Sequence, residues 1–381
     1  MTRGVAVLGS TGSIGRSTLR VLERNADRFH VVALTAFGSK DLLLDQARAV
    51  RADYVGLVNG NSGSATVNGS AVAEGSDCLV EAATHPDAQI VLNAVVGAAG
   101  LRATLAALRA GKRVALANKE SLVMAGDLVL DAAREGGGEI VPVDSEHSAV
   151  LQCLGDRTGK DIRRLILTAS GGPFREWDRD RLLEATVDEA LRHPTWDMGP
   201  KITVDSATLV NKALEVIEAH FLFGMGYDAI EVVVHPQSII HAFVEFVDGS
   251  VLSQVGFPTM ELPILYALTH PDRVADAGTP IFDAVAAGPL TFEPVRHADF
   301  RAFTLGVGAG EAGGTAPAVF NATNEVVVQA FLEGAIPFRA IGEVIESVLN
   351  DHEIQPANNL ETVLAADQWA RERGGTLCSS R

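Results

Sequence analysis

The sequence predicts an α/β protein with a doubly wound, Rossmann-like domain first, an α+β domain in the centre and a small all-helical domain at the C-terminus. Three patterns predict this order. Strand-like and helix-like stretches alternate over residues 1–143, which is typical of a doubly wound parallel sheet. Strand patterns dominate the centre and include a hairpin turn at Asp248-Gly249. Beyond residue 300, apolar residues recur at helical spacing.

The N-terminal alternation sets the elements of the first domain. Buried strands are expected where Val, Ile, Leu and Ala run together, at residues 4–9, 31–34, 54–58, 90–94, 113–117 and 139–143. Helices are expected between them, at residues 15–24, 41–50, 99–109 and 120–134. Residues 59–75 are rich in Gly, Ser and Asn, so they are expected to form an exposed excursion.

The remaining residues predict two further domains. Strands are expected at residues 164–169, 230–234, 239–247 and 251–255, with one long helix over residues 205–223. These elements predict a mostly antiparallel α+β domain over residues 144–274. The proline-containing residues 275–300 are expected to form an irregular linker. Helices expected at residues 316–333, 337–349 and 359–372 form the domain over residues 301–381.

The composition limits the classes of function. The formal net charge of −17 repels the phosphate backbone of nucleic acids, so nucleic-acid binding is not expected. The three cysteines lack Cys-x-x-Cys spacing, which favours neither a disulfide framework nor a thiolate zinc site. No apolar run approaches membrane-spanning length, and no targeting signal precedes the first strand. We therefore expect a cytoplasmic protein that does not bind membranes.

A glycine-rich turn follows the first predicted strand. Gly9, Gly12 and Gly15 lie in the segment GSTGSIG, which leads into the first predicted helix. Glycines allow a tight turn and a close backbone approach, and a helix N-terminus attracts a pyrophosphate. The spacing is GxxGxxG rather than GxGxxG, so the position of the segment predicts a dinucleotide site more than its spacing does. An ordinary glycine-rich turn is the alternative.

The end of the second predicted strand favours NADP over NAD. NAD enzymes usually place Asp or Glu there to bind the ribose 2′-hydroxyl, and no acidic residue occurs before Asp41. Ser39 and Lys40 could instead contact a 2′-phosphate. Lys40 could equally be a solvated surface lysine.

Polar residues follow two later strands of the predicted sheet, where ligands bind in open α/β folds. Lys119, in the segment NKES, could bond a substrate hydroxyl or stabilise an oxyanion, although Asn118 could simply cap a helix. In extended backbone, Asp144 and Glu146 would share a face, and a divalent cation would relieve the repulsion between their carboxylates. The alternative is an N-cap by Ser145 with acidic neighbours.

The central domain contains the densest group of polar motifs. Ser170 with the two glycines after it could form a phosphate-binding turn. Residues 193–201 carry Pro, Gly, Trp and Met, which would suit a mobile flap that covers a ligand. Asn211 and Glu215 are spaced i, i+4 and would share a helical face beside Lys212. The alternative is a solvent-facing stretch of an amphipathic helix.

The motifs, taken together, resemble one enzyme family. GSTGSIG, NKESLV, PVDSEHSA, ASGGPF, HPTWDMGPKITVDSATLVNKALEVIEAHFLF, VVVHPQSIIHAFVEF and FNATNEV occur in this order. The sequence closely resembles 1-deoxy-D-xylulose 5-phosphate reductoisomerases from Val5 to past Asn350. The central motifs are much more specific to this family than the glycine turn is.

The resemblance implies a role for each matching residue. It implies metal ligation by Asp144, Glu146 and Glu215. It implies catalytic or substrate contacts by Lys119, Ser145, Glu146, Ser170, His193, Trp196, Met198, Ser206, Asn211, Lys212 and Glu215, with Ser170, Ser206, Asn211 and Lys212 at the phosphate. It implies NADPH contacts by Thr11, Gly12, Ser13, Ile14, Asn118, Glu120 and Gly199, with Gly38 and Ser39 near the 2′-phosphate. At that last position the sequence has FGSK where the family often has a Lys-Asn or Arg-Asn pair.

The resemblance also implies the reaction and the assembly. The expected activity is NADPH-dependent isomerisation and reduction of 1-deoxy-D-xylulose 5-phosphate to 2-C-methyl-D-erythritol 4-phosphate, a step of isoprenoid precursor synthesis by the MEP pathway. It would require one Mg²⁺ or Mn²⁺. The family suggests a homodimer, formed through the hairpin at residues 239–255.

Two other functions are compatible with parts of the sequence. One is a plain NADP-dependent dehydrogenase of another small phosphorylated or acidic carbonyl substrate. If that substrate were a semialdehyde, the chemistry would need a nucleophilic cysteine such as Cys153, which we expect in the core. A non-catalytic NADP sensor would keep the glycine turn but would not need Asp144, Glu146 and Glu215 together.

Overall fold

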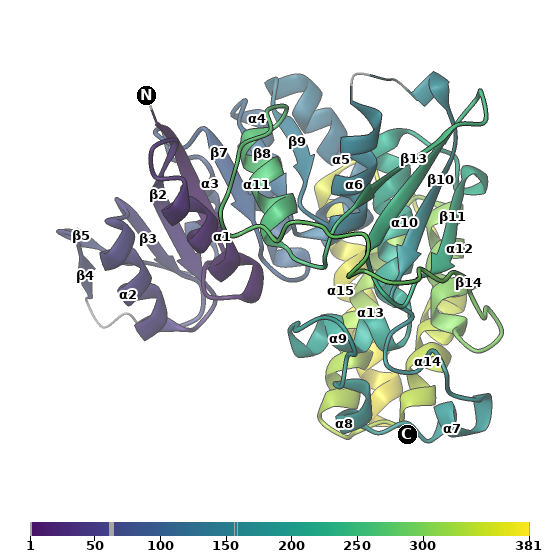
Figure 1. The fold of residues 1–381 in the computed structure, drawn as a ribbon. Coiled ribbons are helices and arrows are strands. Elements are labelled where there is room, and N and C mark those ends of the chain that lie inside the picture. Colours follow the sequence, from purple (N-terminus) through teal and green to yellow (C-terminus); the bar gives the residue numbers. More distant parts are fainter. Residues whose placement is uncertain (1, 61–64, 156, 158, 381) are drawn as a thin grey trace. The chain divides into compact units, whose positions relative to one another are not determined.

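The computed structural model describes residues 2–60, 65–155, 157 and 159–380 (Figure 1). The chain divides into two compact units. The first unit comprises Met1–Ser121, Leu128–Ser148 and Thr259–Pro280, and the second comprises Leu122–Asp127, Ala149–Pro258 and Ile281–Arg381. The domain boundaries expected at residues 143, 274 and 300 stay predictions.

The first unit is built on a seven-stranded sheet in the order β6-β3-β2-β1-β7-β8-β9. The strands are β1 (Arg3–Leu8), β2 (Phe29–Ala36), β3 (Tyr54–Leu57), β6 (Ala73–Glu74), β7 (Ile90–Asn93), β8 (Arg113–Leu116) and β9 (Glu139–Pro142). Neighbouring strands pair in parallel, which confirms the doubly wound sheet. The strand order reverses at β1, so the glycine turn after β1 lies at the topological switch point where such sheets bind ligands.

The helices expected in this unit are confirmed, with small changes at their ends. They are α1 (Ser13–Arg24), α2 (Lys40–Val50), α4 (Leu101–Arg109) and α5 (Lys119–Gly136). The structure adds α3 (Asp77–Ala83), which was not expected, and the short η1 (Ala98–Gly100) before α4. Helix α5 is kinked at Ala125, whose backbone is not helical.

Helix α11 (Glu261–Thr269) joins the first unit from far along the sequence, and no helix is predicted there. It packs against α1, β8 and β9. The Arg24 guanidinium contacts Glu261 at 2.6 Å and Asp276 at 2.7 Å, which fastens this segment to α1. The pattern did not reveal α11 because apolar residues surround it rather than forming one face; its residues 263–269 are all buried.

The excursion expected at residues 59–75 is only partly correct. Residues 61–64 lie outside the described residues. Among the others, β4 (Thr66–Val67) and β5 (Ser70–Ala71) pair antiparallel, and β6 pairs with β3 as an edge strand of the main sheet. Strands of two residues are too short to show a periodic pattern in the sequence.

The second unit contains a five-stranded sheet in the order β13-β12-β10-β11-β14. Its strands are β10 (Ile162–Ala169), β11 (Ile230–Val234), β12 (Ile240–Phe246), β13 (Val251–Val255) and β14 (Glu293–Pro294). Only β10 and β11 pair in parallel among these described strands, so the mostly antiparallel sheet is confirmed. Shorter helical segments lie around it: α6 (Ser145–Leu154, which begins in the first unit), η2 (Gly159–Asp161), α7 (Arg179–Leu183), α8 (Val187–Ala190) and η3 (Tyr227–Ala229).

The single helix expected over residues 205–223 is wrong. The structure has α9 (Pro200–Ala207) and α10 (Val210–Phe223), separated at Leu209, which adopts a left-handed conformation with φ 59°. A leucine does so at a cost of about 1–2 kcal/mol, and burial of its side chain in the core of the unit offsets that cost. Pro200 occupies the first turn of α9, where its fixed φ suits a helix start.

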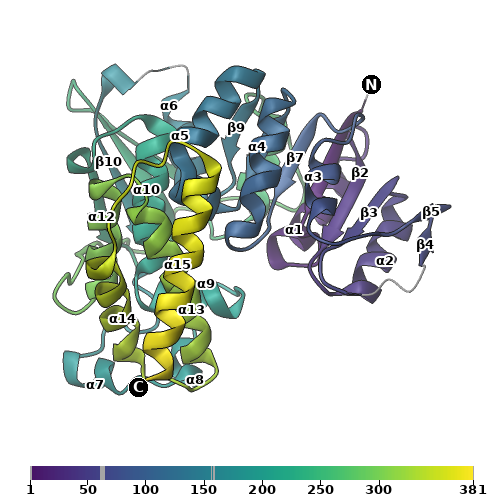
Figure 2. The same cartoon turned by 180° about the vertical axis from the view of Figure 1, so that it is seen from behind.

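The helices expected at the C-terminus are confirmed. They are α13 (Ala316–Leu332), α14 (Phe338–Asp351) and α15 (Leu360–Ser379, which ends seven residues later than expected), and Figure 2 shows them together. Helix α12 (Arg301–Ala312) precedes them and was not among the expected ranges. Helix α13 packs against both α14 and α15. Within the described residues, we find no helix with the length and apolar character that a membrane crossing requires.

Candidate active site

The glycine turn after β1 is compact and requires glycine at two positions. Gly9 has a φ of 81°, and the backbone amides of Gly9 and Ser10 both donate to Thr35 O, at 3.0 and 2.9 Å. A Cβ on Gly15 would lie only 2.3 Å from Gly9 O, so a side chain there would displace the turn. Gly12, the N-cap residue of α1, is exposed, so this helix N-terminus is accessible to an anion.

The other predicted cofactor residues of the first unit lie beside the glycine turn and after the ends of β2 and β8. Thr11 and Ile14 are partly exposed beside the turn, and Ser13 is exposed. Gly38 and Ser39 follow β2 on the surface, and Ser39 is the N-cap residue of α2.

Asn118 positions a loop instead of capping α5 with its side chain. Its Nδ2 donates to Val95 O at 2.8 Å and to Gly97 O at 2.9 Å, and it also contacts Glu120 Oε2 at 2.9 Å. Both Asn118 and Glu120 are buried. The side chain therefore fixes the segment that follows β7 against the segment that follows β8. The simple N-cap alternative for Asn118 does not describe these contacts.

Two buried residues behind this loop were missed by the sequence analysis. Asn93 Nδ2 donates to Gly100 O at 3.0 Å and to Thr104 Oγ1 at 2.8 Å, and Thr104 contacts Ser121 Oγ at 3.1 Å. The signal that could have found Asn93 is a polar residue at the last position of an otherwise apolar strand.

Lys119 and Asp144 form an ion pair at the start of α5 and α6. The distance between Lys119 Nζ and Asp144 Oδ2 is 2.8 Å, and the side chains are 9% and 15% exposed. Burial reduces screening by water, so this pair interacts more strongly than a surface pair does. The ion pair therefore fixes the position of the Lys119 ammonium group beside the Asp144 carboxylate.

Asp144 and Glu146 are close together, but for a different reason from the one predicted. Glu146 lies in the first turn of α6, not in an extended segment, so the shared strand face is wrong. The Glu146 amide approaches Asp144 Oδ1 at 3.4 Å, and Ser145 Oγ donates to Glu146 Oε2 at 2.7 Å. Carboxylate oxygens of the two residues lie within 4.8 Å of each other. Two oxygen donors at this spacing suit a hard divalent cation.

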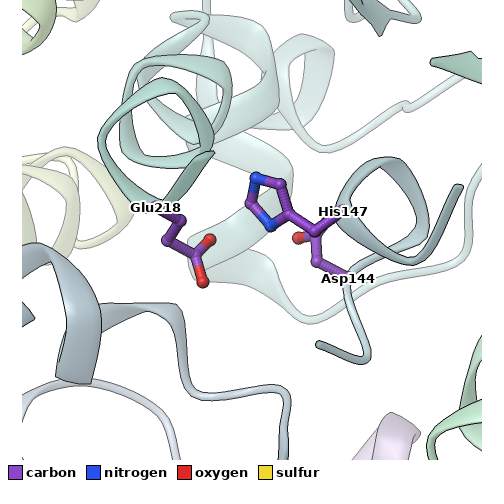
Figure 3. A group of neighbouring side chains, drawn as sticks. All are labelled: Asp144, His147 and Glu218. Carbon is purple, nitrogen blue, oxygen red and sulfur yellow. The ribbon is translucent and has the colours of Figure 1, made fainter. Parts of the chain in front are cut away.

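A histidine accompanies this acidic pair. Figure 3 shows Asp144 next to His147, which belongs to the first turn of α6 and is fully buried. A ring nitrogen of His147 lies within 4.8 Å of a carboxylate oxygen of Asp144. The same figure labels Glu218, a buried residue of α10. The sequence analysis included neither residue in its metal set.

In the second unit, His193 joins two of the predicted phosphate ligands. Its Nδ1 accepts from the backbone amides of Thr195 and Trp196, at 3.1 and 2.9 Å. The ring hydrogen is therefore assigned to Nε2, which lies 3.0 Å from Ser170 Oγ and 3.1 Å from Ser206 Oγ. Burial, with a smaller effect of Arg175, lowers the pKa of His193 from 6.5 to about 4.

The polar residues of α10 are buried rather than solvent-facing. Lys212 and Glu215 are 4% and 1% exposed. Glu215 accepts hydrogen bonds from both Asn211 Nδ2 and Lys212 Nζ. Burying two charges in the domain is costly unless they compensate each other, as Lys212 and Glu215 do. The solvent-facing alternative is therefore wrong for these two residues, whereas Asn211 is half-buried.

The predicted flap forms a loop that ends at α9. Trp196 and Met198 are partly exposed, and the Trp196 ring lies 6.4 Å from the His241 ring. Thr203 Oγ1 donates to Gly199 O at 2.9 Å. Pro200 and Lys201, which the prediction placed in the flap, already belong to α9.

Each unit thus gathers its own share of the predicted residues. The first unit holds Thr11, Gly12, Ser13, Ile14, Gly38, Ser39, Asn118, Lys119, Glu120, Asp144, Ser145 and Glu146. The second unit holds Ser170, His193, Trp196, Met198, Gly199, Ser206, Asn211, Lys212 and Glu215. The predicted metal set takes two ligands from the first unit and one from the second.

Sequence models of one family match most of the chain. The 1-deoxy-D-xylulose 5-phosphate reductoisomerase model matches residues 5–126, the model of the C-terminal domain of that enzyme matches residues 140–223, and a further DXP reductoisomerase C-terminal domain model matches residues 255–373.

Relatives and solved structures agree with these matches. The 1-deoxy-D-xylulose 5-phosphate reductoisomerase of Ralstonia pickettii is 49% identical, over 97% of this chain and 96% of its own. That of Pelotomaculum thermopropionicum is 48% identical, over 98% and 97%. The Zymomonas mobilis enzyme in complex with NADPH has a TM-score of 0.91 at 42% identity, over 100% of both chains. A DOX-P reductoisomerase in complex with NADPH, fosmidomycin and magnesium has a TM-score of 0.95 at 38% identity, over 99% and 98%. The chain therefore belongs to the 1-deoxy-D-xylulose 5-phosphate reductoisomerase family.

Proposed function

We propose that this chain converts 1-deoxy-D-xylulose 5-phosphate to 2-C-methyl-D-erythritol 4-phosphate, with NADPH as reductant and one Mg²⁺ or Mn²⁺. The observation that carries the proposal is the buried pairing of charged residues in the motifs of the family. Lys119 faces Asp144 in the first unit, and Lys212 faces Glu215 in the second. A protein that only sensed NADP would gain nothing from burying these charges, because each carries a desolvation cost.

The residues of the first unit fit a dinucleotide. The tight glycine turn leaves the N-terminus of α1 accessible, and we assign Thr11, Gly12, Ser13 and Ile14 to the pyrophosphate. Gly38 and Ser39 are assigned to the ribose 2′-phosphate, with the absence of an acidic residue at the end of β2 as support. Asn118, Glu120 and Gly199 are assigned to the nicotinamide half. Bound by these residues, NADPH would supply a hydride for the reduction.

The carboxylates fit a hard cation. Asp144 and Glu146 present oxygens within 4.8 Å of each other, and Glu215 is assigned as the third ligand because the family motif matches at that position. When bound, a divalent cation acts as a Lewis acid and stabilises negative charge that develops on the substrate oxygens. Lys119 keeps its ammonium group at Asp144, where it can donate a hydrogen bond to a substrate hydroxyl. Ser145 can donate to a neighbouring substrate oxygen.

The phosphate group is assigned to residues of the second unit. His193 donates its Nε2 hydrogen toward Ser170 and Ser206, so both hydroxyl hydrogens are left to point at a bound anion. Asn211 and Lys212 add an amide and an ammonium donor. Trp196 and Met198 are assigned to cover the substrate and exclude water. Contacts to this remote phosphate would hold the substrate while a carbon–carbon bond breaks and re-forms.

A plain NADP-dependent dehydrogenase is less well supported. Its covalent chemistry would need a reactive thiolate, and Cys153 belongs to the hydrophobic core cluster of the second unit. Full activity after alkylation of the accessible thiols is the result expected from the reductoisomerase.

We also propose a homodimer formed through the hairpin of β12 and β13. Val247, Val251 and Leu252 are exposed apolar residues at its tip and on β13, which is an edge strand of the sheet. The measurement is the molar mass in solution, with L252K as the variant expected to shift it toward the monomer. If the unaltered chain had the molar mass of a monomer, the homodimer assignment would be wrong. The cytoplasmic location stays a prediction.

The function is tested by following NADPH oxidation. We expect oxidation to require 1-deoxy-D-xylulose 5-phosphate and a divalent cation, and to stop when a chelator is added. Identification of 2-C-methyl-D-erythritol 4-phosphate as the product distinguishes the isomerising enzyme from a simple reductase. Oxidation that continues without the cation, or that yields an unbranched product, would contradict the proposal.

A further inference from the structure

Asp205 is a buried carboxylate that has no role in the reaction as proposed above. It lies in α9, is 1% exposed, and immediately precedes Ser206, one of the proposed phosphate ligands. A carboxylate with so little access to water is strongly unfavourable unless its charge is compensated. The groups that compensate the Asp205 charge therefore show which parts of the fold this carboxylate connects.

Two helices supply those partners. Lys201 Nζ, one turn earlier in α9, contacts Asp205 Oδ2 at 2.8 Å. Asn324 Nδ2, from α13 of the C-terminal bundle, donates to Asp205 Oδ1 at 2.8 Å. Each carboxylate oxygen thus has its own partner, and Asp205 links α9 to α13, on which α9 also packs.

Asn324 is oriented by this carboxylate. The residue is fully buried, and its Oδ1 has no hydrogen-bond partner among the described residues. An unsatisfied buried acceptor is unfavourable, because it has lost its hydrogen bonds to water. Turning the amide over would bring Oδ1 against the negative charge of Asp205, so the donor must face the carboxylate. The chain thus tolerates an unpaired acceptor in order to give Asp205 a donor.

The position of Lys201 connects this contact with the flap. Lys201 lies two residues after Gly199, where the loop that carries His193, Trp196 and Met198 meets α9. At the other end of that loop, His193 contacts Ser206, the residue next to Asp205. Both ends of the loop are therefore tied to α9, and α9 is tied to α13 by Asp205.

We propose that Asp205 is a positioning residue for substrate binding. Through Lys201 and Asn324 it holds α9 in place, so that Ser206 keeps its position for the phosphate and the loop at residues 193–199 closes about a fixed end. This inference rests on the proposed role of Ser206 at the phosphate. It concerns mainly the affinity for the phosphorylated substrate, because Gly199 is the one proposed NADPH contact next to α9.

The test compares D205N, K201M and the double variant in steady-state kinetics. Asp205→Asn keeps the shape of the side chain and removes its charge, whereas Lys201→Met removes the partner and leaves Asp205 in place. We expect each single variant to raise KM for 1-deoxy-D-xylulose 5-phosphate on the order of tenfold, with a much smaller change in kcat. KM for NADPH should rise less than KM for the substrate, because only Gly199 among the proposed NADPH contacts lies next to α9. KM for the substrate in the double variant should be no higher than in the more impaired single variant, because both substitutions remove the same contact between Lys201 and Asp205.

D367N is the matched control. Asp367 pairs with Arg371 at i, i+4 in α15, at 2.7 Å, and is also largely buried, and its partner lies on its own helix. It should lower Tm without raising KM for the substrate. Hydrogen exchange without substrate gives a second readout: amides of residues 193–204 should exchange faster in D205N and K201M than in the unaltered chain, and should be unchanged in D367N.

The outcomes separate the inference from the proposed function. If D205N lowers Tm but leaves KM and the exchange of residues 193–204 unchanged, Asp205 is merely structural and the inference is overturned. The same conclusion follows if the factors by which D205N and K201M raise KM multiply in the double variant. Absence of substrate-dependent NADPH oxidation in the unaltered chain would instead contradict the proposed function, while the exchange experiment would still test the tether.

Discussion

The bonding of the His193 ring allows its two nitrogens to be tested separately. Nδ1 accepts from the backbone of the flap, and Nε2 donates toward the two serines. His193→Asn keeps an acceptor near the position of Nδ1 and has no atom at Nε2. His193→Gln keeps a donor near Nε2 and loses the acceptor. The first variant therefore removes the contact to the phosphate ligands, and the second removes the contact to the flap.

The size of the effect follows from the contacts that are lost. A neutral hydrogen bond contributes about 0.5–1.5 kcal/mol, and a buried group left without its partner costs up to about 3 kcal/mol. Ser170 and Ser206 are both partly buried and both contact Nε2. We expect H193N to lose about 1.5–3 kcal/mol of transition-state stabilisation, which is a decrease in kcat/KM of roughly tenfold to a hundredfold. H193Q should lose less.

The pH dependence gives the decisive assay. Because the pKa of His193 is lowered from 6.5 to about 4, the ring is neutral near pH 7 and contributes no ionisation there. The buried position of the His193 ring, bonded to the flap and the two serines, is favoured fully above pH 6.5. This contribution is lost as pH falls toward 4, because a His193 ring that has left this position binds a proton more readily than the buried ring does. Initial rates of NADPH oxidation against substrate concentration, measured across this range, give kcat/KM for the three proteins. An ionisation near 6.5 that is present in the unaltered chain and absent from H193N would refute the reasoning, as would an H193N variant with unchanged kcat/KM.

Three further predictions concern the metal, the phosphate and the cofactor. Asp144→Asn should abolish turnover while the fold, followed by circular dichroism, and NADPH binding, followed by fluorescence, remain; near-normal activity would contradict the metal assignment. Lys212→Ala should raise KM for the substrate at least tenfold by removing a phosphate contact, and should also lower Tm because it leaves Glu215 buried without its ammonium partner; an unchanged KM would place the phosphate elsewhere. Gly15→Ala should raise KM for NADPH but not for the substrate, because its Cβ would lie 2.3 Å from Gly9 O; equal effects on both KM values would indicate general damage to the fold.

The sequence predicted the elements whose signal is local. Parallel strands buried on both faces are continuous apolar runs, so every strand of the main sheet except the two-residue β6 was found to within one or two residues, and the glycine turn followed from its place after β1. The break between α9 and α10 was not predictable from residue types, because a leucine takes the left-handed conformation at residue 209. Only tertiary packing stabilises that choice.

The candidate site shows the same division. The residues of the site were named from motifs, but their contacts depend on long-range structure. Sequence spacing placed Asn118 at a helix N-terminus, whereas the fold turns its side chain toward the loop after β7. Spacing also placed Lys212 and Glu215 on a helix surface, whereas the helix is buried on nearly every side. Burial is a property of the assembled domain, so periodicity within one helix could not reveal it.

The discontinuous make-up of the first unit has a consequence for synthesis of the chain on the ribosome. Helix α11 and Asp276 come from residues 259–280, yet they pack on α1 and neutralise Arg24 near the N-terminus. The N-terminus emerges from the ribosome first, and domains fold as units. The first unit therefore stays incomplete, with one side of α1 not covered by α11, until about 280 residues have been made. A fragment ending at residue 143 would preserve that nascent state permanently, with the apolar surface that α11 normally covers open to self-association.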